Sequence, residues 1–297
     1  MSLPGFFVPW EFSPTLLVAF ACAGLGFAWG TRRRRVPLPR QLAFWSGFAV
    51  LYISLHTRVD YYAEHEFFVH RIQHLVLHHL GPLLVMAAYP AVVIKAALPL
   101  RWRMAWRRAR HTTVLRWTLR ALFHPTVVTL VFIASVLVWV IPSVQFVSML
   151  DWRLYRFMNW SVTLTGFAYW GMLLDHRPAP PARLAPGLRV LSPILTMSPQ
   201  ILAGAIITFS QRDMFPIFDI CGRAFFGMPA LIDQSLGGLI MWVPAALIEA
   251  VGGLMALRCW MRLSQNGRLQ RRPRRQFAAP TSAAKPTSAP AGPGPAG

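Results

Sequence analysis

Five histidines lie within fifteen residues of one another in the segment EHEFFVHRIQHLVLHHLGP, residues 64–82: His65, His70, His74, His78 and His79. His70, His74 and His78 are spaced four residues apart, so on a helix they form one slowly drifting stripe. Imidazoles in apolar surroundings are costly without a partner. Two histidines at this spacing can chelate one metal ion. The pattern therefore predicts a metal site, or a column of rings along which an ion is handed.

The residues before this stripe would form an acidic mouth for it. They are His56, Asp60, Glu64, His65 and Glu66. Carboxylates beside neutral imidazoles concentrate a cation and orient the rings. The donor types suit cuprous, cupric or zinc ions.

Two other interpretations of the histidines stay open. The rings could hydrogen-bond neighbouring helices and bind no metal. Alternatively, His56 and His70 could be the axial ligands of a b-type haem, which we favour less than copper. The three cysteines, Cys22, Cys221 and Cys259, contain no CxxC pair, which disfavours a thiol-based copper carrier.

The surrounding chain has the composition of a polytopic all-α membrane protein. It is 55% hydrophobic and 13% charged, and a soluble protein has about twice that charged fraction. Its apolar runs predict seven transmembrane helices, at about 10–30, 41–57, 66–88, 122–141, 157–174, 190–210 and 235–257. These lie in a transmembrane domain, residues 1–262, which precedes a cytoplasmic tail, residues 263–297. The tail is basic, then rich in Ala and Pro, and we expect it to be disordered.

The net charge of +20 is distributed unevenly between the predicted loops. Arginines gather in 31–40, 99–121, 175–189 and the tail. Eight of the ten acidic residues lie on the other side: Glu11, Asp60, Glu64, Glu66, Asp151, Asp213, Asp219 and Asp233. The positive-inside rule then places the N-terminus outside and the C-terminus in the cytoplasm. The charge thus indicates orientation and contact with anionic lipid, not a nucleic-acid partner. The tryptophans of 91–121 suit a helix lying in the headgroup layer.

Two motifs resemble those of one protein family. VHRIQHLVLHHLGPLLVMAAYP (69–90) resembles the H-x-x-Q-H-L-x-L segment, followed by P-L-L and a later Pro, of the CtaG-type cytochrome c oxidase assembly factors. DQSLGGLIMWVP (233–244) is similar to that family's last-helix segment. His70, Gln73 and His74 match the first motif. The second is matched by Asp233, Gln234, Gly237, Gly238, Met241 and Trp242.

The resemblance implies a seven-helix protein of the bacterial plasma membrane that helps to build a caa-type haem-copper oxidase. It implies an assembly factor, not an enzyme, with oxidase subunits as partners and copper as the delivered metal. Val140 and Asn159 stand where family members often have histidine, whereas His78 and His79 stand where apolar residues are common. These departures predict a site that is either shifted toward the third helix or weakened.

Several residues of these two motifs, and Glu249 beyond them, also have physical roles of their own. Met241 offers a thioether to Cu(I). Asp233, level with the acidic mouth, is a further candidate metal ligand, and its charge also suits the N-terminal end of a helix dipole. Gly237 and Gly238 permit close helix approach, and Pro82 can bend the third helix. Glu249, deeper in the last helix, fits either an ion path or a polar contact.

Three functions follow from these residues. The first is an oxidase assembly factor that binds copper through the histidine stripe. The second is a metal-ion or proton transporter that uses the histidine column. The third is a metal-free scaffold for oxidase subunits. The sequence contains no catalytic motif, so we expect no enzyme.

Overall fold

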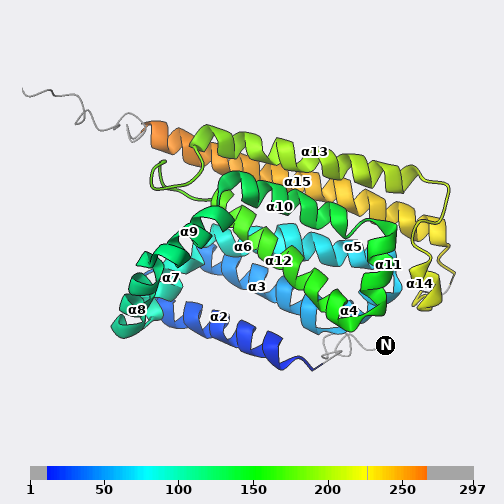
Figure 1. Ribbon diagram of the computed structural model, residues 1–297, viewed down its shortest axis with the longest axis horizontal. Coiled ribbons are helices and arrows are strands. Elements are labelled where there is room, and N and C mark those ends of the chain that lie inside the picture. Colours follow the sequence, from blue (N-terminus) through cyan, green and yellow to red (C-terminus); the bar gives the residue numbers. More distant parts are fainter. Residues whose placement is uncertain (1–11, 226, 266–297) are drawn as a thin grey trace, which may run out of the picture.

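The computed structural model describes residues 12–225 and 227–265, and this part of the chain is helical and contains no strand. Its main helices run along the long axis of the molecule (Figure 1): α2 (Pro14–Arg33), α3 (Leu38–His56), α5 (Phe67–Leu75) with α6 (Gly81–Ala87), α10 (Pro125–Val138), α12 (Trp152–Leu173), α13 (Pro186–Phe209) and α15 (Ala230–Gln265). Shorter helices connect them: α4 (Arg58–His65), α7 (Pro90–Ala97), α8 (Leu100–His111), α9 (Thr113–Leu122), α11 (Pro142–Leu150) and α14 (Ile217–Ile220).

The described helices support a membrane protein, although fewer of them qualify as spans than the sequence predicts. Three are long and apolar enough to cross a bilayer: α2, α13 and α15. The number rises to five if two bent pairs each form one span. These pairs are residues 67–87 with α7, bent by 61°, and α9 with α10, bent by 55°. Helices α3 and α12 occupy the expected ranges 41–57 and 157–174 but are not among these candidates. Seven spans therefore remain a prediction.

The last helix is longer than expected at both ends. It begins at Ala230 instead of 235 and continues to Gln265, so residues 263–265, assigned to the tail, are helical. The longer start places Asp233 and Gln234 inside the first turns of α15. The remaining tail residues 266–297, and Glu11 near the N-terminus, lie outside the described residues.

The two ends of the molecule differ in the segments that they carry. Helices α8 and α9, which hold most arginines of 99–121, lie at one end, and α4, α11 and α14 lie at the other (Figure 1). We call these the arginine-rich end and the acidic end. Trp102, Trp106 and Trp117 on α8 and α9 are exposed, as an interfacial helix pair requires. Which end faces the cytoplasm remains a prediction.

The helix that carries the histidines contains a π-helical turn, η1 (Val76–Leu80), between α5 and α6. Pro82 follows it and has no N–H with which to bond the carbonyl oxygen of His78, four residues earlier. The indole Nε1 of Trp170 on α12 donates to that oxygen instead, at 3.0 Å. The sharp bend lies further on, between α6 and α7, where Tyr89 adopts a left-handed conformation with φ of 55°. Trp170 thus supplies the hydrogen bond that Pro82 cannot make next to the π-turn.

Candidate metal site

His70 and His74 form a pair of adjacent, tilted rings inside the helix bundle. Their centroids lie 4.4 Å apart with the ring planes tilted by 37°, and both residues are buried. Both ring nitrogens of His70 and the Nε2 of His74 lack a hydrogen-bond partner in the described part of the chain. Buried polar atoms of this kind are rare because leaving water unpaired costs about 1–3 kcal/mol each. Three unpaired nitrogens in adjacent rings form a donor set suited to a ligand.

The π-turn gives His78 and His79 different surroundings from those of the His70–His74 pair. The ring of His78 stacks on Phe132 at 3.9 Å, and its Nε2 lies 3.0 Å from Ser135 Oγ. The Nε2 of His79 lies 3.1 Å from Glu249 Oε1. The Nε2 atoms of His78 and His79 thus have partners, whereas those of His70 and His74 have none in the described part of the chain.

A cavity of about 30 Å³ lies next to these rings and is lined by side chains of several helices. The lining residues whose side chains contain nitrogen, oxygen or sulfur are Arg71, His74, His78, His79, Gln200 and Met241. This volume holds about one water molecule or one ion. The cavity brings His74 and His78 together with Met241 of α15, although 163 residues separate His78 from Met241 in the sequence.

Arg71 is a component of this site that the sequence reasoning missed. Its guanidinium is buried, lies 4.9 Å from the centre of the Phe67 ring, and donates to Gln145 Oε1 at 3.0 Å. No described side chain pairs with its Nε. A buried positive charge beside the imidazoles opposes any cation bound there, and does so twice as strongly for a divalent ion as for a monovalent one. An arginine next to a histidine in a membrane helix was the signal that could have indicated this role.

Asp233 lies at the start of the histidine helix, where both of its carboxylate oxygens have partners. They accept from the backbone N–H groups of Phe67 at 3.0 Å and Phe68 at 2.8 Å. Arg223 pairs with the same carboxylate at 2.6 Å and with Glu66 at 3.2 Å. Asp233 thus caps α5 from another helix, a role that the sequence did not indicate.

Arg223 supplies a positive charge between the carboxylates of Asp233, Glu66 and Asp219. Burial alone would lower the pKa of its guanidinium, but hydrogen bonds to Asp233 and Asp219 raise that pKa above its usual value. The neighbouring Gln234 accepts from Met214 N at 2.7 Å and donates to Arg212 O at 3.0 Å. Asp233 and Gln234 therefore connect α15 to the start of α5 and to the loop after α13.

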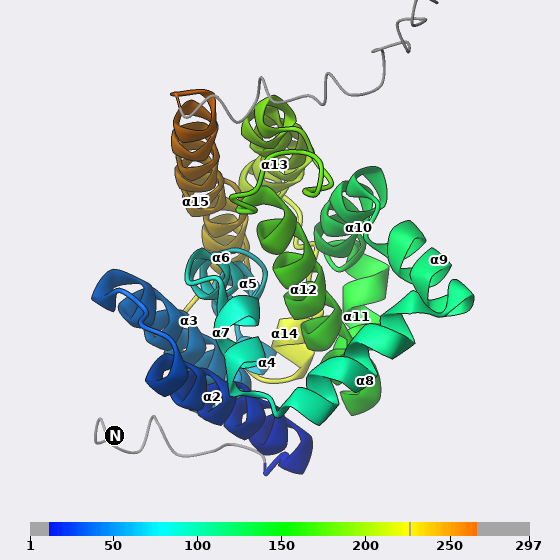
Figure 2. The ribbon, with the colours of Figure 1, turned by 90° about the vertical axis from the view of Figure 1, so that its left-hand side faces the viewer.

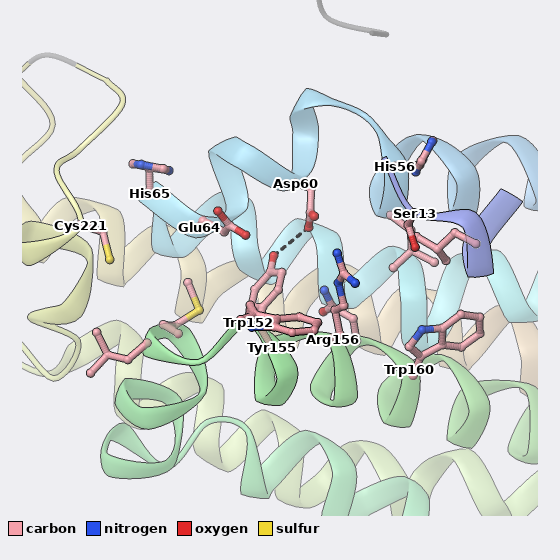
Figure 3. A pocket seen from close by; sticks show the side chains of 15 residues that line it. Ser13, His56, Asp60, Glu64, His65, Trp152, Tyr155, Arg156, Trp160 and Cys221 are labelled. Carbon is pink, nitrogen blue, oxygen red and sulfur yellow. Dashed lines mark hydrogen bonds between the residues drawn. The ribbon is translucent and has the colours of Figure 1, made fainter. Parts of the chain in front are cut away.

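Gln73 belongs to a second polar group, located toward the acidic end. Its Nε2 donates to Ser54 O at 2.7 Å and to Asp60 Oδ1 at 2.6 Å. The Tyr155 hydroxyl donates to the same Asp60 oxygen at 2.8 Å (Figure 3). The motif glutamine thus holds α3, α4 and α5 together beside the His70–His74 pair.

The expected acidic mouth corresponds to a pocket of about 430 Å³ whose lining includes His56, Asp60, Glu64, His65 and Cys221. His56 and His65 lie at opposite sides of it in Figure 3. The Nδ1 of His65 is within 2.7 Å of the Tyr61 carbonyl oxygen. Among the described residues, no group of three or more His, Cys, Asp or Glu side chains is placed to hold a metal ion. The structure therefore brings His74, His78 and Met241 together but does not gather His56, His65 and Asp233 around them.

The remaining motif residues pack helices. A methyl group at Gly237 would collide with the Phe67 ring, and one at Gly238 would lie 2.5 Å from Thr208 Oγ1 on α13. The indole of Trp242 lies 3.4 Å from the same hydroxyl. Val140 packs in an apolar cluster with Phe67 and Met241. Asn159 is buried and lines the pocket of about 430 Å³ described above.

Comparison with known proteins finds one family. The family model described as cytochrome c oxidase caa3 assembly factor (Caa3_CtaG) matches residues 24–263, which include both motifs and every helix of the site. No curated protein and no solved structure matches the chain significantly.

Proposed function

Because the chain belongs to the cytochrome c oxidase caa3 assembly factor family, we propose that it binds Cu(I) through His70 and His74 and helps to supply it to a haem-copper oxidase of the bacterial plasma membrane. The observation that carries this proposal is the buried ring pair. Three of its four ring nitrogens have no hydrogen-bond partner among the described residues. Imidazole nitrogens are ligands for copper, and an unpaired buried nitrogen gains most from a ligand.

The oxidation state follows from the donor set and from Arg71. Cu(I) is soft and accepts imidazole and thioether ligands, and Met241 supplies a thioether on the cavity next to His74. Cu(II) prefers four donors in a plane. No such cluster of His, Cys, Asp and Glu exists in the described residues. The buried guanidinium of Arg71 also disfavours the doubly charged ion more strongly.

The same arginine suits a protein that hands its metal on. Carboxylates close to a metal site neutralise the charge of the cation and help to retain it. Here the charged side chain in the cavity lining is cationic. We infer moderate retention and ready release to an oxidase subunit with a fuller ligand set.

The test is a Cu(I) titration of purified protein against a colorimetric Cu(I) chelator. We expect the wild-type protein to bind one equivalent. The Cu(I) affinity of the double variant His70→Ala/His74→Ala is expected to be lower by about 100-fold or more, because this variant lacks the main donor atoms. The matched control is His111→Ala/His124→Ala, which removes two exposed imidazoles at the arginine-rich end and leaves affinity unchanged.

Equal affinity of the double variant and the wild-type protein overturns the copper site. Oxidase assembly in cells expressing the double variant then separates two roles. Loss of assembly together with loss of copper binding supports copper supply. Normal assembly without copper binding supports the metal-free scaffold.

The transporter alternative is less well supported by the cavity. Its volume of about 30 Å³ accommodates one small occupant, and the rings that line it are buried. One feature favours the alternative: His79 contacts Glu249, which accepts from Thr196, and Thr196 contacts the Tyr169 hydroxyl at 3.1 Å. Copper uptake into proteoliposomes distinguishes the two functions, since a binding protein gives no uptake above protein-free vesicles.

A further inference from the structure

A second cavity, of about 750 Å³, lies at the arginine-rich end, and none of the histidines of the proposed copper site lines it. Residues from the start of α3, the junction of α6 and α7, the segment after α12 and the last turns of α15 line it. Figure 2 views the molecule from this end and shows α6 lying between α3 and α15. The cavity is independent of the proposed copper site.

The charged side chains lining this cavity are all cationic. Arg40 comes from the first turn of α3, and Arg258 and Arg262 lie one turn apart on α15. Because residues four apart share a helix face, these two arginines present their guanidinium groups together. No acidic residue is among the lining residues.

These three arginines have no ion-pair partner in the described part of the chain. In contrast, Arg177, close to the cavity, pairs with Asp175 at 2.6 Å, and Arg223 at the acidic end pairs with three carboxylates. Unpaired guanidinium groups that converge on one cavity create a positive potential. They also present forked donors that match the geometry of phosphate oxygens.

The position of Arg40 is fixed by an aromatic contact. Its guanidinium lies 5.0 Å from the centre of the Tyr89 ring, and the His176 ring packs edge-on against the same tyrosine at 4.6 Å. Tyr89 has the left-handed backbone conformation at the bend between α6 and α7. Such a conformation is unfavourable for a residue other than glycine and persists where surrounding contacts enforce it. The bend thus fixes the position of the Tyr89 ring, against which the Arg40 guanidinium packs.

Apart from Tyr89, His176 and Cys259, the rest of the lining is apolar and includes Ala43, Ala87, Leu174 and Met255. A phosphate ion would leave this surface uncovered, whereas a phospholipid would place its phosphodiester on the arginines and its glycerol and acyl carbons on the apolar walls. We propose that this cavity binds the headgroup of one anionic phospholipid through Arg40, Arg258 and Arg262. Basic pockets between membrane helices at the arginine-rich side recognise such headgroups.

Cys259 lines the same cavity and provides the readout. Replacing Cys22 and Cys221 by serine leaves Cys259 as the single thiol of the chain. The rate at which a maleimide modifies it, in protein purified in detergent, is measured by intact mass. Dioctanoyl phosphatidylglycerol is expected to slow the reaction by about tenfold, because its headgroup binds the guanidinium groups through charge-assisted hydrogen bonds. Dioctanoyl phosphatidylcholine and inorganic phosphate at the same concentration are expected to leave the rate unchanged.

The triple variant Arg40→Gln/Arg258→Gln/Arg262→Gln is expected to lose this protection. The matched control, Arg101→Gln/Arg107→Gln/Arg108→Gln, removes three arginines of α8 that lie outside the cavity and keeps the protection. Equal protection by phosphatidylcholine, or retained protection in a folded triple variant, overturns the proposal. Equal protection by inorganic phosphate overturns its lipid part and leaves a phosphate site. The comparison of the three compounds needs no arginine variant, so it decides the matter even if the triple variant fails to fold.

Discussion

At the scale of single residues, the site is defined by what each buried polar group does or does not contact. Asp233, Gln73 and Gln234 have their hydrogen-bond partners within the protein, whereas three of the four ring nitrogens of the His70–His74 pair have none in the described part of the chain. The motif residues thus divide into those that hold helices and those that remain available to a ligand. The sequence pattern alone could not make this division, because it fixes residue types and not contacts.

Replacing Asp233 by alanine tests its role as a cap. The substitution leaves two N–H groups of α5 without an acceptor and Arg223 without one of its three carboxylate partners. We expect unfolding free energy in detergent to fall by about 3 kcal/mol. Asp151→Ala is the control, because Asp151 caps α12 through Arg153 N but is exposed, and its loss should cost about 1 kcal/mol.

Copper binding by the folded Asp233→Ala protein then decides between the structural role and ligation. A cap contributes no donor, so the Cu(I) stoichiometry of the variant should equal that of the wild-type protein. A lost equivalent, in protein that remains folded, would make Asp233 a ligand after all.

At the scale of elements, the positions of most helices could be predicted from apolar periodicity, but the break in the histidine helix could not. The spacing of His70, His74 and His78 predicts one stripe only if the helix is regular throughout. The π-turn at Val76–Leu80 depends on Pro82 and on a hydrogen bond from Trp170, 88 residues further along the chain. The cap from Asp233 is likewise a tertiary contact. The sequence around the histidines does not indicate that Trp170 or Asp233 contacts this helix. The geometry of the site could therefore be obtained only from the folded structure.

The contact between α13 and α15 depends on the small size of Gly238. A methyl group there would lie 2.5 Å from the Thr208 hydroxyl and 2.7 Å from the Thr208 backbone nitrogen, so the helices would have to separate. We expect Gly238→Ala to lower the unfolding free energy by about 2 kcal/mol. The control is Gly253→Ala in the same helix, where the added methyl meets Pro193 at an ordinary 3.7 Å.

An SDS titration monitored by far-UV circular dichroism measures both glycine variants. Gly253→Ala should be neutral or slightly stabilising, because alanine favours a helix by up to about 1 kcal/mol over glycine. Equal unfolding midpoints for the two variants would show that the α13–α15 contact tolerates a larger side chain.

At the scale of the whole molecule, the separation of charge between the two ends predicts its orientation in the membrane. Cys221 lies at the acidic end and Cys259 at the arginine-rich end, and neither is fully buried. In intact cells a membrane-impermeant maleimide should modify Cys221 and leave Cys259 unmodified until the membrane is permeabilised. Modification in the reverse order would invert the predicted orientation. Single-cysteine variants give each rate separately.

The arginine-rich cavity gives this orientation a further physical support. A headgroup bound by Arg40, Arg258 and Arg262 would connect α3 with the far end of α15. Both helices would then be held at one leaflet, which adds a specific contact to the general attraction between arginines and anionic lipid.

The cap on α5 has a consequence for the order of events during biosynthesis. The carboxylate that satisfies Phe67 and Phe68 belongs to Asp233, so a nascent chain halted before that point has a histidine segment with an uncapped beginning. Met241, too, leaves the ribosome more than 160 residues after His74. We expect polypeptides truncated ahead of α15 to acquire no copper, so that the metal is taken up only once translation of the transmembrane region is complete.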